Sequence, residues 1–258
     1  SGPLVLLLLY QLLQRHDRKF TYRFSIFPET IGAITYIKKN YERLKKRTVY
    51  GLVLTCLGGP IKNISYKMGK NTKIKNIFQE YLISRGDVII RPFDPTEGSN
   101  ERHFCFPTVD LPFGQFGRTL YTKYPEYHNS ADDIAFTDIN QIMNSAREIY
   151  RLLIDFEDQY VESETTVKPS INIQSTDSED FFISKAKYGE PFLTKYNLYP
   201  KVNIDGTNFT TERDFTNKIL NILSMSDGFT SKQFISNKFN IEDQIFDILL
   251  ENNILIKI

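Results

Sequence analysis

The stretch YPEYHNSADD, residues 124–133, places one of the three histidines of this 258-residue chain directly after a tyrosine and shortly before two aspartates. A histidine can bind a metal ion or move a proton at neutral pH, a tyrosine hydroxyl can donate a hydrogen bond, and an aspartate can orient an imidazole ring. An isolated histidine in a polar loop is more commonly a solvated or hydrogen-bonded surface residue. The role of His128 therefore depends on the elements that surround it.

Strand-like and helix-like segments alternate over residues 1–158 and predict an α/β domain. Helical spacing of apolar residues, aromatic or β-branched runs and basic helix ends distinguish the segments. This alternation favours a mostly parallel mixed sheet flanked by helices, with functional loops at the carboxyl ends of its strands. The expected strands are 19–27, 48–57 and 87–93. The expected helices are an apolar helix from Pro3, the helices 31–47 and 72–84, and a long amphipathic helix from Thr137 or Asp138.

The composition changes after this domain. Residues 159–187 are largely polar and acidic, which is typical of a linker. Residues 188–258 contain three helix-like segments followed by a β-rich tail, and this order predicts a small winged-helix domain. Since the apolar helix that begins at Pro3 needs partners to cover it, we also expect the chain to be a processed or truncated part of a longer protein.

Charge argues against a nucleic-acid partner. The net charge is +1, and residues 205–258 carry eight acidic and five basic side chains. The last helix of this unit holds Glu242, Asp243, Asp247 and Glu251, which would face phosphates in a DNA groove. We therefore expect the winged-helix unit to pack on the main domain, on a protein partner or on a second copy of the chain.

Cysteine use and hydropathy indicate a cytoplasmic protein without a membrane span. The apolar run at Pro3–Leu9 is interrupted by glutamines well before the length of roughly 20 residues that a bilayer crossing requires. The two cysteines offer at most one bridge in a chain too large to need it, so we expect both thiols to be free in a reducing compartment.

Several short strings resemble a known enzyme family. YPEYHNSADD is similar to a Tyr-His motif of the zinc-dependent aminopeptidase and glutamate carboxypeptidase family. FPETIGA (27–33) resembles the glutamate loop of that family, and EGSNERHF (97–104) resembles its substrate loop. Strings similar to PETIG, VLTC, SNERHFC, YPEYHNSADD and LYP occur in this order in a bacterial subgroup of aminopeptidase-like proteins with a C-terminal winged helix. The resemblance implies a zinc-peptidase-like fold and hydrolysis of a peptide or aminoacyl amide bond.

The resemblance also implies roles for six residues. In the family, two zinc ions held by histidine and carboxylate ligands activate a water molecule, and a glutamate that binds no metal takes its proton. By this resemblance the candidates are His128 as a zinc ligand, Glu29 as the general base, Tyr127 as a donor to the oxyanion, Asn100 and Arg102 on the substrate side, and Asp132 as a support for the His128 ring.

Departures from the family pattern keep other hypotheses open. Gly59 stands where a carboxylate ligand is usual, Thr30 follows Glu29 where many members have a second acid, and Asn100 replaces an aspartate. The alternative to a hydrolase is a degenerate member that serves as a protein-interaction scaffold, and a nucleic-acid-binding regulator is the third hypothesis. Without the resemblance, Glu29 would be an acid placed favourably at a helix N-terminus.

Overall fold

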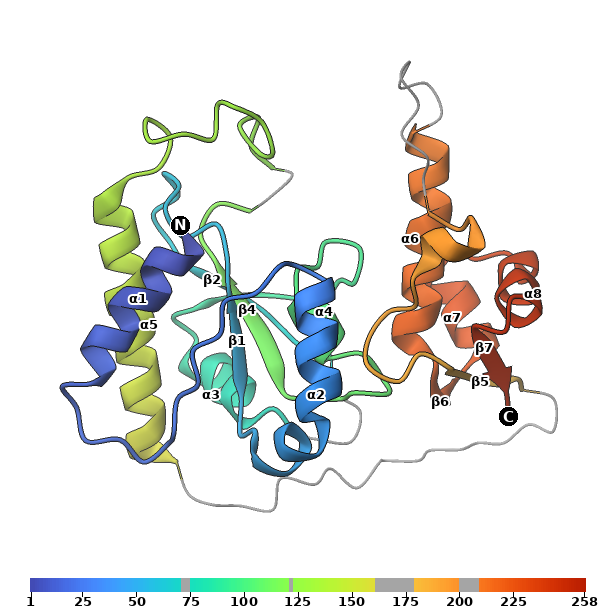
Figure 1. Ribbon diagram of the computed structural model, residues 1–258, viewed down its shortest axis with the longest axis horizontal. Helices are drawn as coiled ribbons and strands as arrows, with labels where there is room; N and C mark the ends of the chain where they lie inside the picture. Colours follow the sequence, from blue (N-terminus) through green and yellow to red (C-terminus); the bar gives the residue numbers. More distant parts are fainter. Residues whose placement is uncertain (71–74, 121–122, 161–178, 200–208) are drawn as a thin grey trace.

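The computed structural model describes two units of the chain (Figure 1). Its described residues are 1–70, 75–120, 123–160, 179–199 and 209–258, and of residues 209–212 only the backbone is described. The first unit is an α/β domain, and the second combines three helices with a small antiparallel sheet.

The sheet of the first unit has four strands in the order β1-β4-β2-β3. β1 (Gly51–Leu54) is parallel to β4 (Phe113–Gly117), β2 (Ser65–Lys67) is parallel to β3 (Ile89–Arg91), and β2 is antiparallel to β4. Two of the three pairings are parallel, so the prediction of a mostly parallel mixed sheet flanked by helices is confirmed. β3 nevertheless runs antiparallel to β1 and β4. The loop after β3 therefore starts at the end of the sheet opposite to the carboxyl ends of β1 and β4.

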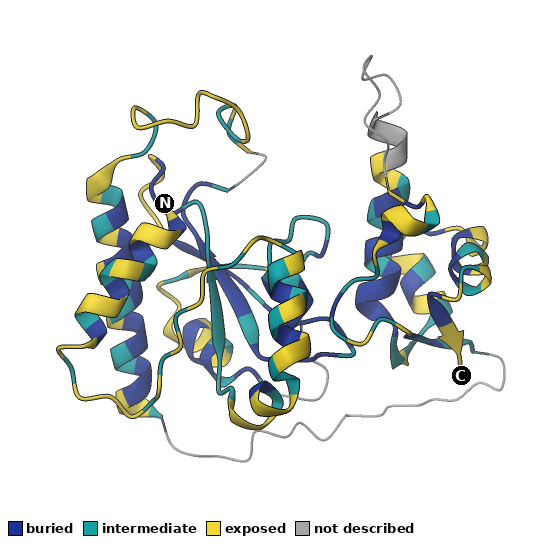
Figure 2. Ribbon diagram, viewed as in Figure 1, coloured by how far each residue is buried: buried dark blue, intermediate teal, exposed yellow. Residues whose placement is uncertain are grey.

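Helices cover both faces of this sheet. α1 (Gly2–Leu13), α3 (Ile77–Arg85) and α5 (Ile139–Gln159) share one core with the sheet residues Tyr66 and Phe116, which are both fully buried. α2 (Ile31–Arg47) and the short α4 (Glu101–Phe104) contribute to a second core on the opposite face. Figure 1 shows α2 and α4 on the side of the sheet nearer the second unit, and the buried faces of the helices are dark blue in Figure 2.

The termini of these helices follow the local sequence. Pro3 lies in the first turn of α1, three basic residues end α2, and the side chain of Asp138 caps α5 by accepting a hydrogen bond from the Asn140 N–H at 2.8 Å. The predicted helices at 31–47 and from Asp138 are confirmed.

α1 buries Val5, Leu9 and Leu13 and leaves a second apolar face exposed at Leu4, Leu7 and Tyr10.

The strand predicted at 19–27 is wrong. Phe20, Tyr22 and Phe24 are half-buried and alternate with exposed residues, as in a strand, but the segment joins no sheet. Its start is instead fixed by the Lys19 N–H, which donates to the Glu157 carboxylate at 2.6 Å. Period-two burial therefore arises here from aromatic side chains that pack on the core without a hydrogen-bonded neighbour strand.

The second unit has a three-stranded sheet of order β6-β5-β7. The predicted helices and β tail are present, and β5 lies inside the segment predicted as a linker, of which residues 161–178 fall outside the described residues. Its elements are β5 (Phe181–Ser184), the 3-10 helix η1 (Leu193–Tyr196), α6 (Phe209–Met225), β6 (Asp227–Ser231), α7 (Lys232–Phe239), α8 (Asp243–Glu251) and β7 (Leu255–Lys257).

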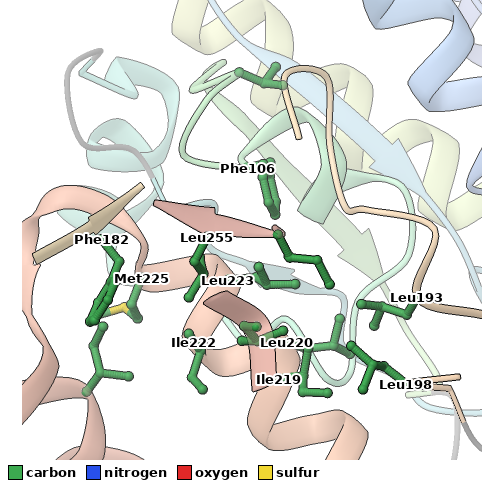
Figure 3. Close-up of a cluster of buried hydrophobic side chains, with 14 of the residues drawn as sticks. Phe106, Phe182, Leu193, Leu198, Ile219, Leu220, Ile222, Leu223, Met225 and Leu255 are labelled. Carbon is green, nitrogen blue, oxygen red and sulfur yellow. The ribbon is translucent and has the colours of Figure 1, made fainter. Parts of the chain in front are cut away.

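The two units share one hydrophobic core. Phe106 of the first unit belongs to the same buried cluster as Phe182, Leu223 and Leu255 of the second (Figure 3). The Lys70 ammonium donates to the carbonyl oxygen of Ser224 at 2.6 Å, at the end of α6. The C-terminal unit therefore packs on the main domain, which is the first of the arrangements expected from the sequence.

None of the helices in the described part of the chain combines the length and the apolarity that a bilayer crossing requires.

Candidate functional site

A polar cleft of about 310 Å³ lies at the carboxyl end of β1. Thr55 and Cys56, which follow β1, form one wall, and Thr119, which follows β4, lies beside them. Carboxyl ends of parallel strands are the usual place for a ligand in an α/β sheet. Four of the six predicted site residues line this cleft: Glu29, Tyr127, His128 and Asp132.

Glu29 is held by a tight backbone turn before α2. The Ile31 N–H donates to the Glu29 carbonyl at 2.7 Å, and Thr30 between them has φ 62° and ψ −75°. This is the geometry of a γ-turn that costs energy for a β-branched residue. Such backbone strain persists only where neighbouring contacts fix it.

Two neighbouring polar residues supply those contacts. The Ser99 hydroxyl donates to the Glu29 carboxylate at 2.6 Å, and the Asn100 side-chain oxygen accepts a hydrogen bond from the Thr30 N–H at 2.9 Å. Asn100 was predicted on the substrate side, but it does not line the cleft. The structure places it behind the turn, where it fixes the orientation of Glu29.

A buried ion pair anchors the loop that carries Ser99 and Asn100. Glu101 and Lys67 are almost fully buried, and their charged atoms lie 2.6 Å apart. The Glu101 carboxylate also accepts hydrogen bonds from the Ser99 N–H at 3.1 and 3.2 Å. Three successive residues of EGSNERHF therefore position Glu29, since Ser99 and Asn100 contact the Glu29 turn and Glu101 anchors their loop. The sequence did not predict the anchoring role of Glu101.

Arg102 points away from the cleft. Its guanidinium lies 3.0 Å from the Glu190 carboxylate of the second unit and donates to the Pro95 carbonyl at 3.1 Å. Burial raises the pKa of Glu190, and the Arg102 charge opposes this shift. Arg102 therefore connects the two units, and its predicted role on the substrate side stays a prediction without a contact in the cleft.

The loop of YPEYHNSADD presents Tyr127 and His128 as a stacked pair. Their ring centroids are 3.9 Å apart, and the rings are inclined by 14°. His128 has φ 58°, a left-handed backbone conformation that is uncommon for residues other than glycine. Burial, and then electrostatic interactions with Cys56 and Glu29, raise the pKa of Tyr127, so its hydroxyl keeps its proton at neutral pH.

The polar residues of this loop explain its shape. The Asn129 side chain donates to the Pro125 carbonyl at 2.6 Å and accepts from the Ala131 N–H at 2.9 Å. Asp133 accepts from the Ala135 N–H at 2.7 Å. Asp132 accepts from the Tyr124 hydroxyl at 3.5 Å and, among the described residues, has no hydrogen bond to the His128 ring.

Sequence reasoning missed two cleft residues, Tyr124 and Cys56. The Tyr124 hydroxyl lies 3.7 Å from the Cys56 sulfur, and its ring stacks on Phe136 at 5.0 Å. Burial and the hydrogen bond to Cys56 raise the pKa of Tyr124. Both cysteines are free thiols, as predicted. The signal that could have found Cys56 was its position two residues after the end of β1.

Gly59 leaves no room for a side chain. A Cβ atom at this position would lie 1.9 Å from the Thr119 hydroxyl oxygen and 2.7 Å from the Thr119 Cβ. The Thr119 hydroxyl is buried without a hydrogen-bond partner in the described part of the chain. The carboxylate that the resemblance leads one to expect at position 59 could therefore be accommodated only if Thr119 moved.

The described residues do not fit a zinc centre by themselves. Zinc sites use at least three histidine, cysteine or carboxylate ligands. Among the residues that the structure describes, no three such side chains come together as a group that could hold a metal ion. The only predicted zinc ligand, His128, lines the cleft on an exposed loop.

The fold and cleft together define an α/β protein of peptidase-like architecture. The structure has a TM-score of 0.52 to the crystal structure of a provisionally named peptidase from Clostridium acetobutylicum, with 24% identity, and the match covers 98% of this chain and 52% of that protein. At this identity the likeness shows the fold.

The chain belongs to the family described as domain of unknown function DUF4910, whose model matches residues 1–159. A curated protein from Clostridium acetobutylicum is 31% identical over 159 residues, which are 61% of this chain and 36% of that protein. Its provisional name is polysaccharide biosynthesis protein with aminopeptidase-like domain. The chain thus spans about a third of this curated relative and about half of the solved protein.

Proposed function

We propose that this chain forms part of an aminopeptidase-like hydrolase that cleaves a peptide or aminoacyl amide bond. The observation that carries the proposal is the convergence of Glu29 from one segment with Tyr127 and His128 from a second, distant segment in one cleft at the carboxyl end of β1. The name of the relative with an aminopeptidase-like domain supports the same class.

Glu29 is the proposed general base. Its carboxylate would accept a proton from the attacking water, and the Ser99 hydroxyl at 2.6 Å would hold it in one rotamer. Because Asn100 accepts a hydrogen bond from the Thr30 N–H and so fixes the backbone that follows Glu29, the carboxylate is positioned before a substrate binds.

Tyr127 is the proposed donor to the tetrahedral oxyanion. With a pKa raised above its ordinary value, the hydroxyl is protonated at neutral pH, as an unshifted tyrosine also is, and it can donate a hydrogen bond to the developing negative charge. The proton taken by Glu29 would then pass to the leaving amine. Zinc dependence, with His128 as one ligand, belongs to the same proposal and requires ligands in addition to the described residues.

The test measures hydrolysis of aminoacyl 4-nitroanilides with and without added zinc. We expect Glu29→Gln to lower kcat by at least about 100-fold, and Tyr127→Phe to lower it by about 100-fold, with the fold unchanged by circular dichroism. Glu42→Gln, which changes an exposed glutamate on α2, is the matched control and should retain the wild-type rate. A Glu29→Gln rate equal to that of the wild type would refute the assignment of the base.

A protein-interaction scaffold is the second candidate function. It is favoured by the close contact between Gly59 and Thr119, because this contact disfavours a carboxylate where the resemblance expects one. Under this hypothesis, residues 188–258 form a winged-helix-like unit that contributes a protein-binding surface. Absence of amide hydrolysis by the wild-type chain at any zinc concentration would favour the scaffold over the hydrolase.

A further inference from the structure

Residues 186–190 of the second unit lie against the two helices that follow the cleft residues. This segment lies between β5 and η1. α2 follows Glu29 and Thr30 in the chain, and α4 follows Ser99 and Asn100. A segment that contacts both helices can therefore act on both sides of the hydrogen bond between Ser99 and Glu29.

Polar and aromatic contacts hold segment 186–190 on the first unit. The Thr108 hydroxyl, in the loop after α4, donates to the carbonyl of Ala186 at 2.7 Å. The ring of Tyr188 meets the ring of Tyr41 on α2 edge to face, with their centroids 5.7 Å apart. The segment is therefore fixed at its start and at its centre.

Gly189 allows the segment to approach both helices closely. Its φ of 133° is a conformation that favours glycine. A Cβ atom at this position would lie 3.1 Å from the Ile34 side chain of α2 and 3.4 Å from the His103 side chain of α4. Glu190, the next residue, reaches α4 from this position.

Glu190 forms an ion pair with Arg102 of α4. Glu190 Oε1 lies 3.0 Å from Arg102 Nε, and both side chains are mostly buried. In the described part of the chain, Arg102 Nε has no hydrogen-bond partner of aligned geometry. Charge, and not a directed hydrogen bond, therefore holds this contact.

Arg102 in turn touches the loop before α4 at two places. Its guanidinium donates to the Pro95 carbonyl at 3.1 Å. Its side chain packs on Gly98, where a Cβ atom would lie 2.5 Å from Arg102 Cδ. Gly98 and Ser99 both line the cleft, so the Arg102 side chain connects Glu190 to the wall that carries Ser99.

We propose that Glu190 of the second unit is a positioning residue of the cleft. Its charge holds the Arg102 side chain against the loop 95–99. With this loop held, the Ser99 hydroxyl stays on the Glu29 carboxylate. The inference rests on the proposed function, because it gives the second unit a part in aligning the general base. Glu190 is not among the described residues that line the cleft, so it acts only through Arg102.

Hydrogen exchange of single amides, measured by NMR on the full chain, tests the inference. The N–H groups of Ser99 and Thr30 donate to side chains of residues 100–101 and therefore report on the held loop. We expect Glu190→Gln to speed exchange at both amides by at least about tenfold, because Arg102 is left without its ion pair. The amide of Leu153, buried in the middle of α5, should keep the wild-type rate. Glu190→Asp keeps the charge and should restore part of the protection.

Further variants separate the proposed path from general stability. Lys187→Gln removes an exposed charge from the same segment and is the matched control, with no expected change. Arg102→Gln should reproduce the effect of Glu190→Gln, and the double variant should exchange no faster than the faster single variant. Unchanged rates at the two reporter amides, an equal rise in α5, or effects that multiply in the double variant would overturn the inference.

Kinetics distinguishes this inference from the proposed function. If the wild type hydrolyses aminoacyl 4-nitroanilides, Glu190→Gln should lower kcat by at least about tenfold and leave KM within about twofold, since Glu190 does not touch the substrate. A raised KM with an unchanged kcat would contradict the positioning role. A wild type without hydrolysis would contradict the proposed function, and the exchange rates would then decide whether Glu190 holds the loop.

Discussion

Protonation of the buried His103 should destabilise the fold in mildly acidic solution. His103 is fully buried on α4, and neither ring nitrogen has a hydrogen-bond partner in the described part of the chain. Burial, with a contribution from the Arg102 charge, lowers the pKa of His103 from 6.5 to about 3. The ring therefore stays neutral in the folded state under conditions in which the unfolded chain binds a proton.

The direction and size of the effect follow from this difference. Below the unfolded-state pKa of 6.5 the unfolded chain binds more protons, so the free energy of unfolding falls as the pH falls toward the folded-state pKa of about 3. The slope is about 1.4 kcal/mol per pH unit, which gives a loss of about 2 kcal/mol between about pH 7.5 and pH 5. This contribution is fully present above pH 6.5.

The assay is urea denaturation of the wild type and His103→Leu at several pH values. Leucine has a similar volume and no titratable group, so the difference between the two free energies of unfolding isolates His103 from the shared carboxylates. We expect this difference to change by about 2 kcal/mol between about pH 7.5 and pH 5. His128→Gln removes an exposed imidazole and should keep the wild-type dependence, because His103 is still present. Parallel curves for the wild type and His103→Leu would refute the reasoning.

Three further predictions concern the anchor, the cleft and the C-terminal unit. Lys67→Met leaves the buried Glu101 carboxylate without its ion pair and should lower the free energy of unfolding by about 3–5 kcal/mol in urea denaturation; a loss below about 1 kcal/mol would contradict the anchoring role. Gly59→Asp should destabilise the chain by about 1–3 kcal/mol because of the Thr119 contact, and Thr119→Gly in the same chain should restore part of the loss, whereas a stable single variant would disprove the steric argument. The chain should show no salt-sensitive binding to duplex DNA in anisotropy measurements at near-physiological ionic strength, since α8 carries acidic side chains, and such binding would support the regulator hypothesis instead.

Local sequence signals predicted the helices better than the strands. The helix 139–159 begins directly after its cap, Asp138, and the helix 31–47 ends with three basic residues, as the sequence indicates. β4 was missed because FGQFG contains two glycines and a glutamine, which have low strand propensity, and its central position in the sheet is decided by its neighbours. The segment 19–27 has strand-like alternation, but a strand also needs a partner for its backbone.

The same distinction applies to the candidate site. The resemblance pointed to Glu29, Tyr127, His128 and Asp132, and the structure brings all four to one cleft. The structure places Asn100 behind the Glu29 turn, whereas the resemblance pointed to the substrate side. Neither this position nor the contact of Gly59 with Thr119 could be inferred from spacing, because both depend on which loops meet across the sheet edge.

The sequence by itself determined the α/β class, the helices, the free thiols and the residue types available for hydrolysis, because these depend on composition, periodicity and short motifs. Only the tertiary structure decided which side chains meet. Ser99 and Asn100 reach the Glu29 turn from about 70 positions away in the chain, and Arg102 pairs with Glu190 of the second unit. Such contacts depend on strand order and loop paths, since residues far apart in the chain are brought together only when the sheet forms.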